Sequence, residues 1–382
     1  MRTIYFDYNA TTPLAPAVRE AMLPFLNEIY GNPSSVHHVG RRARALLDDA
    51  RDRVAVVWRC KPSEVIFTSG GTESNNLAIF GTARLLRAKG RHLITSPTEH
   101  HAVLHCFDYL AKKEGFEVTY LPVDSNGLVE VGDLAKAIRA DTTLVSIMAA
   151  NNETGTIQPV PELGALCRER KVLFHTDAVQ WFGKEPFHSM HQFKADLVSV
   201  CGHKFYGPKG TGALFVRAPL LPDPILFGGG HENERRAGTE NLAGIAGLTL
   251  AIETHWQNPI FPTAQLSALT QQLVVSLSTM PSVCLRRTAA ACLANTVSFT
   301  VAGCDSIGLL AGLDLEGVCA SSGSACSAGS VEPSHVLLAM GVPASLAASF
   351  IRFSLGRAST ATEVTRVTEL LPSIIERSRT PR

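Results

Sequence analysis

The sequence predicts an α/β protein in which a large domain holds a mostly parallel sheet with helices on both faces, beside a smaller α+β domain. Three observations support this fold class. From about residue 64 onward, short β-rich runs alternate with segments of helix length. Near residue 255 the alternation stops at a proline-containing break, HWQNPIFPT. The chain has 382 residues, 45% of them hydrophobic, which is enough for more than one domain. We expect the large domain over 14–255 and the small domain over 1–13 and 256–382.

The elements of the large domain follow from its alternating pattern. Helix-like segments follow most of the β-rich runs, which is the arrangement that places strands in parallel. In such sheets, ligands bind beyond the carboxyl ends of the strands. The expected strands are EVIFTS (64–69), HLITSP (92–97), EVTYLPV (117–123), TLVSIMAA (143–150), KVLFHTDA (171–178) and ADLVSVCG (195–202).

Beyond residue 255 the expected elements are fewer and differently ordered. Strands are expected in NTVSFTVAG (295–303) and IRFSLGR (351–357). The expected helices are AQLSALTQQLVVSLSTM (264–280), SIGLLAGLD (306–314) and TEVTRVTELLPSIIERS (362–378).

Composition excludes several classes of function. The 35 basic and 34 acidic side chains leave a net charge of +1, so nothing favours nucleic acid or an anionic membrane as a partner. No stretch approaches the roughly 20 apolar residues of a membrane-spanning helix, and the start of the chain does not resemble a signal peptide. Nine scattered cysteines without a CxxC pattern argue against a zinc knuckle and favour free thiols. We expect a cytoplasmic protein.

The first candidate site is the turn after EVIFTS. Gly70, Gly71, Thr72 and Glu73 join a strand to a helix, and free N–H groups at a helix start bind anions such as phosphate. The spacing is not that of a P-loop. An ordinary tight turn with a threonine cap explains the same residues equally well.

Two later strand ends favour the anion site. Asp177 ends the run KVLFHTD, and Lys204 follows ADLVSVCGH, so both are expected in the same crevice. A desolvated lysine offers a nucleophilic amine. The alternatives are a helix cap for Asp177 and a solvated loop position for Lys204. Together, a lysine, an acid and an anion site are what pyridoxal phosphate requires.

Further candidates accompany this group. His100 follows HLITSP and is placed to lie against a cofactor ring. His101 and His105 are spaced as a metal pair, but no third ligand is indicated. Arg352 alternates with apolar residues in a strand, where it either grips a substrate carboxylate or forms a structural ion pair.

Ten motifs, in order over almost the whole chain, resemble one family: the NifS/IscS-type cysteine desulfurases of the aminotransferase class V group. They are YFDYNATTP (5–13), GNPSSVHHVG (31–40), TSGGTESNN (68–76), TEHHAVL (98–104), NNETG (151–155), HTDAVQ (175–180), GHKFYGPKG (202–210), GGGHENERRAGTEN (228–241), SSGSAC (321–326) and IRFSLGR (351–357). The resemblance implies a pyridoxal phosphate enzyme of fold type I, with a seven-stranded type of sheet, that works as a homodimer. It also implies removal of sulfur from L-cysteine, leaving L-alanine and an enzyme persulfide.

The resemblance assigns roles to the matching residues. Lys204 corresponds to the lysine that bonds to the cofactor and takes the substrate's α-proton. His100 corresponds to the ring-stacking histidine and proton carrier, and it is the candidate that the family suggests for deprotonating Cys326. Asp177 faces the ring nitrogen, and Arg352 with Asn152 binds the substrate carboxylate. The remaining cofactor contacts implied are Asn152 and Gln180 at the phenolic oxygen, Gly71, Thr72 and His203 at the phosphate, and Thr239 reaching that phosphate from the second subunit.

Cys326 stands in a run of small residues, ASSGSACSAG, and corresponds to the cysteine that receives sulfur. A segment of about 318–332 is expected to be a mobile loop, because Gly, Ser and Ala offer little to pack. The resemblance implies no metal in the cofactor site, although Cys326 is a candidate for a transient iron–sulfur ligand. It implies an iron–sulfur scaffold or another sulfur acceptor as partner. Cys201 departs from the serine of many members, so its phosphate contact is not carried over.

Three other functions compete with the desulfurase. A selenocysteine lyase and a class V aminotransferase share the cofactor chemistry, but an aminotransferase needs no cysteine at position 326. A catalytically silent scaffold needs none of Lys204, Asp177, His100, Arg352 and Cys326, so their joint presence argues against it.

Overall fold

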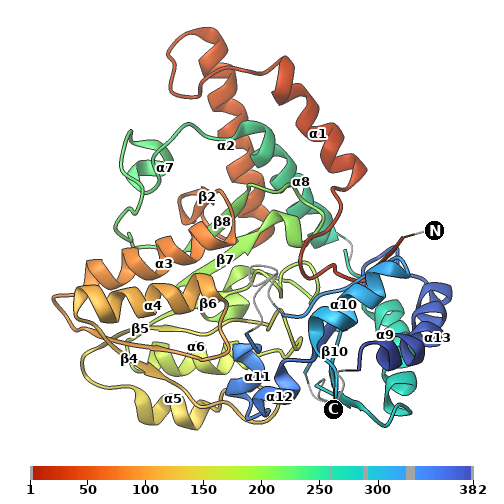
Figure 1. The fold of residues 1–382 in the computed structure, drawn as a ribbon. Helices are drawn as coiled ribbons and strands as arrows, with labels where there is room; N and C mark the ends of the chain where they lie inside the picture. The colour runs from red at the N-terminus through yellow and green to blue at the C-terminus, as the bar shows by residue number, and fades with distance from the viewer. Residues whose placement is uncertain (1–2, 258–259, 287–290, 324–331, 380–382) are drawn as a thin grey trace.

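The computed structural model describes residues 3–257, 260–286, 291–323 and 332–379 (Figure 1). Its largest feature is a seven-stranded sheet in the order β2-β8-β7-β6-β5-β3-β4. The strands are β2 (Val65–Thr68), β3 (His92–Thr95), β4 (Glu117–Tyr120), β5 (Thr142–Ser146), β6 (Leu173–Asp177), β7 (Leu197–Cys201) and β8 (Gly212–Val216). Only β8 runs antiparallel to its neighbours, so the predicted mostly parallel sheet is confirmed.

Helices cover both faces of this sheet, as the alternating pattern predicts (Figure 1). On one side lie α3 (Gly71–Leu86) and α4 (His101–Glu114), which pack against each other, and on the other lie α5 (Val131–Ala137) and α6 (Val160–Glu169). Every residue of β2, β3, β5, β7 and β8 is buried, which explains their continuous apolar runs. The edge strand β4 keeps Glu117 and Tyr120 exposed.

Three helices that the pattern did not indicate pack together at one end of the molecule (Figure 1). They are α1 (Pro16–Asn27), α2 (His38–Trp58) and α8 (Leu242–Gln257), with the short α7 (His231–Glu234) leading into α8. Helix α2 presents Leu47, Val54 and Trp58 to the core. Among the described residues, no helix combines the length and apolar character that a membrane span requires.

The C-terminal part forms an antiparallel sheet in the order β12-β10-β9, with helices packed on it. Its elements are α9 (Thr263–Ser278), β9 (Val283–Leu285), β10 (Thr296–Val301), α10 (Ser306–Leu315), β11 (Val318–Cys319), α11 (His335–Ala339), α12 (Ala344–Ala347), β12 (Phe350–Ser354) and α13 (Ala361–Arg377). This is the α+β character that the sequence predicts. The N-terminal strand β1 (Ile4–Tyr5) pairs in parallel with β11. The exact limits of the two domains stay a prediction.

Candidate functional site

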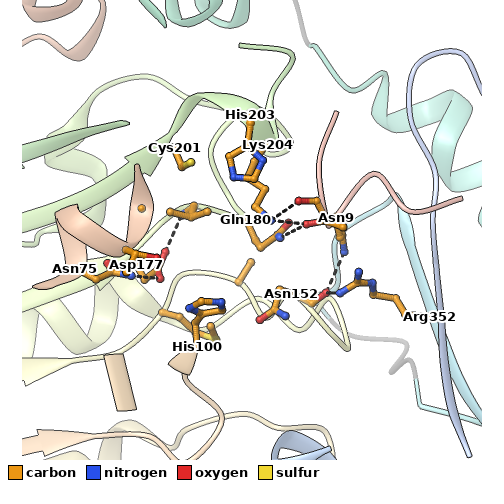
Figure 2. Close-up of a pocket in the computed structure, with 16 residues that line it drawn as sticks. Asn9, Asn75, His100, Asn152, Asp177, Gln180, Cys201, His203, Lys204 and Arg352 are labelled. Carbon is orange, nitrogen blue, oxygen red and sulfur yellow. Dashed lines mark hydrogen bonds between the residues drawn. The ribbon is translucent and has the colours of Figure 1, made fainter. Parts of the chain in front are cut away.

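A cavity of about 260 Å³ lies where the strands of the large sheet end and the N-terminal segment meets β12 (Figure 2). In Figure 2, Asp177 and Arg352 lie at opposite ends of the cavity, and Lys204 and His100 on opposite sides of it. The side chains come from strand ends, as parallel sheets dictate. The lining residues are Asn9, Ala10, Gly71, Thr72, Asn75, His100, Met148, Ala150, Asn152, Asp177, Val179, Gln180, Cys201, His203, Lys204 and Arg352.

Asp177, the last residue of β6, is an acid held by two donors. It is only 5% exposed. Its Oδ1 accepts from the Val179 backbone N–H at 2.9 Å, and its Oδ2 accepts from Asn75 Nδ2 at 2.6 Å. Burial raises the pKa of this carboxyl, and these hydrogen bonds offset only part of that rise. A cation beside Asp177 would therefore stabilise its charged form.

Lys204 is a buried amine with a lowered proton affinity. Its Nζ donates to the backbone oxygens of Asn9 and Ala10, each at 2.8 Å. Burial lowers the pKa of Lys204 to about 8. The uncharged, nucleophilic form of the amine is therefore accessible near neutral pH.

His100 caps helix α4 with its ring. Its Nδ1 accepts from the Ala102 backbone N–H at 3.0 Å, which places the ring proton on Nε2 in the neutral form. Burial, with a smaller contribution from the charge of Lys204, lowers the pKa of His100 to about 4. His100 is therefore a neutral imidazole that presents an N–H group.

The start of helix α3 forms the polar end of the site. Gly70 is the N-cap and has φ +156°, so Thr72 lies inside the helix, and the threonine-cap alternative is wrong. A Cβ on Gly71 would approach Val179 Cγ2 to 2.8 Å, so only glycine brings the backbone this close. The first turn of α3 leaves backbone N–H groups without intrahelical partners, and Thr72 and His203 lie nearby in the lining, which is the arrangement that an anion site requires.

Arg352 forms the structural ion pair that the sequence offered as one interpretation, and it also lines the cavity. It is 1% exposed, and its Nη2 pairs with Asp7 Oδ1 at 2.8 Å, so it is an ion-pair residue. Its Nη1 donates to the backbone oxygens of Asn152, at 2.7 Å, and Gly323, at 3.1 Å. Its Nε has no hydrogen-bond partner among the described residues, although it is buried beside the cavity.

Asn9 and Lys184 complete the site and were missed by sequence reasoning. Gln180 Nε2 donates to the Asn9 backbone oxygen at 2.8 Å. Lys184 Nζ donates to Asn9 Oδ1 at 2.7 Å and to Gln180 Oε1, so the orientation of the Gln180 amide is fixed. Burial lowers the pKa of Lys184 well below its ordinary value.

Asn75, the residue that orients Asp177, was also missed. Asn9 and Asn75 both stand inside the quoted motifs YFDYNATTP and TSGGTESNN. Their positions as short polar residues inside these motifs could have identified both of them as candidate site residues.

Three predicted features are not among the residues that line this cavity in the described part of the chain. Thr239 is exposed and is not among the lining residues. Cys326 falls outside the described residues, together with 324–331 of the expected loop; the described start of that loop, Val318–Cys319, is strand β11. The His101 and His105 rings stack 5.0 Å apart. No group of three metal-ligating side chains suited to a metal ion occurs in the part of the chain that the structure describes.

Comparison with known proteins places this site in a family. Residues 4–367 match the family described as aminotransferase class-V. The chain is 48% identical over 380 residues to a protein of Dictyoglomus turgidum named cysteine desulfurase IscS, covering 99% of this chain and 96% of that one.

Solved structures agree with this match. A NifS-like protein superposes with a TM-score of 0.89 at 38% identity, covering 98% of this chain and 99% of that one. A structure described as SspA in complex with cysteine has a TM-score of 0.82 at 36% identity, and the match covers 94% of this chain and 100% of that one. The chain therefore belongs to the aminotransferase class-V family.

Proposed function

We propose that this protein is a pyridoxal phosphate-dependent cysteine desulfurase. The observation that carries the proposal is the convergence of Lys204, Asp177 and Arg352 around one cavity. The proposal is supported by the full-length relative named cysteine desulfurase and by the similar structure described with bound cysteine. The same names favour a desulfurase over an aminotransferase or a silent scaffold.

The cavity fits pyridoxal phosphate by the chemistry of its donor set. Lys204 supplies the amine for covalent attachment, and the buried Asp177 is suited to a protonated ring nitrogen. A protonated ring nitrogen beside Asp177 would stabilise the ionised carboxylate, which burial alone disfavours. When bound, the cofactor draws electrons from the substrate's α-carbon.

The other cofactor contacts follow from the position of each residue in the cavity. We assign His100 to the ring face, and Asn152 and Gln180 to the phenolic oxygen. We assign Gly71, Thr72 and His203 to the phosphate, joined by the partner subunit's Thr239 in a homodimer. Because Lys184 holds Gln180 Oε1, the Gln180 amide presents its NH₂ group as the donor.

Residues of this chain bind the substrate and transfer its protons. Arg352 binds the substrate carboxylate together with Asn152, and its Nε–H is one of the donors that its contacts with Asp7, Asn152 and Gly323 do not use. Lys204 takes the proton from the α-carbon and returns it. Because Nδ1 of His100 accepts from the Ala102 N–H and the ring proton is on Nε2, His100 is suited to donate a hydrogen bond or a proton, and less suited to take the Cys326 proton.

The sulfur step balances without an external oxidant. The Cys326 thiolate attacks the substrate sulfur, the carbon–sulfur bond breaks and a sulfur–sulfur bond forms. The sulfur is oxidised, and the carbon that loses it gains hydrogen, so L-cysteine and the thiol become L-alanine and a Cys326 persulfide. The acceptor would be an iron–sulfur scaffold or another thiolation protein in the cytoplasm. Seven cysteines among the described residues are free thiols, which supports a reducing compartment; they are Cys60, Cys106, Cys167, Cys201, Cys284, Cys304 and Cys319.

The decisive assay compares alanine and sulfide release by the wild type and Cys326→Ala under reducing conditions. We expect the variant to lose release of both products from L-cysteine, while Cys284→Ser, which changes an exposed cysteine, keeps the wild-type rate. Persulfide mapping should find sulfur on Cys326. Wild-type rates in Cys326→Ala, or sulfur on Cys201 or Cys319 instead, would refute the mechanism.

A further inference from the structure

The two flanks of residues 324–331 are held at the cavity by separate contacts. On the N-terminal side, Ser321 and Arg352 exchange backbone hydrogen bonds of 2.7 and 3.2 Å. Arg352 Nη1 also donates to the Gly323 backbone oxygen at 3.1 Å. This flank is therefore bonded to a residue that lines the cavity.

The C-terminal flank contacts Glu153 and the residues at the start of helix α4. Ser334 Oγ donates to Glu153 Oε2, and the Ser334 side chain also caps helix α11. His335 Nε2 lies 3.0 Å from the Glu99 backbone oxygen, and the His335 ring lies 4.7 Å from that of His101. These contacts fix the start of α11 against the residues around His100.

Glu153 lies between the two flanks. Its carboxylate accepts a hydrogen bond from Ser334, and it faces the side of Gly323 where a Cβ would stand, since such a Cβ would lie 3.5 and 3.6 Å from its two oxygens. Glu153 is 2% exposed, and its backbone N–H donates to Asn151 Oδ1 at 2.8 Å. It follows Asn152 in the chain but does not line the cavity.

We propose that Glu153 is a positioning residue for sulfur transfer: it bonds Ser334 on one flank and follows Asn152, whose backbone oxygen shares Arg352 Nη1 with Gly323 on the other flank, so it keeps residues 323 and 334 beside the cavity. The inference rests on the proposed function, in which Cys326 receives the sulfur. Holding a nucleophile near its target lowers the entropic cost of attack.

The contacts predict which step depends on Glu153. Because Glu153 lies outside the cavity lining, its removal should leave substrate binding intact and slow only the transfer of sulfur. Glu153→Gln keeps an oxygen that can accept from Ser334, so it should restore most of the rate. Ser334→Ala breaks the same hydrogen bond from the other side.

The test uses holoenzyme in single turnovers with L-cysteine. Stopped-flow absorbance follows substrate binding, and alkylation with mass spectrometry follows persulfide on Cys326. We expect Glu153→Ala and Ser334→Ala each to slow persulfide formation about tenfold, the size of one hydrogen bond to a charged group, with binding unchanged. The double variant should be no slower than the slower single variant. Asp305→Ala, which removes the cap of helix α10, is the matched control for a lost helix cap and should lower only thermal stability.

The outcomes separate the two hypotheses. Wild-type rates of persulfide formation in both Glu153→Ala and Ser334→Ala would overturn the role of Glu153 and leave the desulfurase intact. A slow rate in Asp305→Ala of the same size would also overturn it, because stability alone would then explain the effect. A wild-type enzyme that forms no persulfide on Cys326 would instead overturn the proposed function, and this inference with it.

Discussion

The lowered pKa of Lys204 predicts how the apoprotein captures pyridoxal phosphate as pH changes. Burial brings this pKa from the usual 10.5 to about 8. At pH 7, roughly 9% of such an amine is uncharged, against about 0.03% of an ordinary lysine, a ratio of about 300. At pH 10 the two fractions are about 99% and 24%, so the ratio falls to about 4. Because only the uncharged amine attacks the cofactor, its advantage over an ordinary amine should be large at pH 7 and small at pH 10.

The assay measures the rate at which the absorbance of the covalent adduct appears when apoprotein meets the cofactor between pH 7 and 10. The same reaction with Nα-acetyl-lysine is the reference, and dividing by it removes the pH dependence of the cofactor itself. Lys204→Ala gives the background from other amines. The normalised rate should fall by about 70-fold across this range, with the bend near pH 8.

A normalised rate that stays constant between pH 7 and 10 would refute the reasoning. That result would mean that Lys204 titrates as an exposed lysine does and that the cavity does not desolvate it.

Two further predictions concern a hydrogen bond in the site and a helix end. Asn75→Ala removes the 2.6 Å bond to Asp177, so the pKa of Asp177 should rise further and the cofactor should bind about tenfold more weakly in an absorbance titration; unchanged affinity would contradict the role of Asn75. Thr360→Ala breaks the capping box that Thr360 forms with Glu363 at the start of α13, and should cost about 1 kcal/mol in chemical denaturation with turnover unchanged. An unchanged denaturation midpoint would show that this cap contributes nothing.

The strands of the large sheet were predictable because most are buried on both faces and read as apolar runs. Strand β8 was missed because its five residues follow a glycine-rich stretch and run against the parallel pattern. Helix α8 was not indicated because it is apolar around most of its surface and lacks a polar face to give it a period.

The site was predictable to the extent that strand ends determine it. Lys204, Asp177 and His100 follow three different strands, and parallel strands bring their ends together. The contacts of Asn9 and Lys184 could not be predicted, because their partners are set by how distant segments pack. Asn9 contacts Gln180 across 171 residues and Asn295 across 286, and no local pattern encodes such distances. Thr239 does not line the cavity of its own chain, so the phosphate contact proposed for it would require a second copy.

The hydrogen bonds of the N-terminal segment have a consequence for biosynthesis. Asn9 N–H donates to Ser354 Oγ, and Asp7 pairs with Arg352, each across 345 residues. At about 5–20 residues per second, a ribosome needs roughly 20–70 s to make the chain between these partners. The N-terminal segment therefore leaves the ribosome long before its partners exist, and the complete cavity can form only when translation is almost finished. Cofactor loading should consequently be a post-translational event, and nascent chains stalled before Arg352 should not retain pyridoxal phosphate.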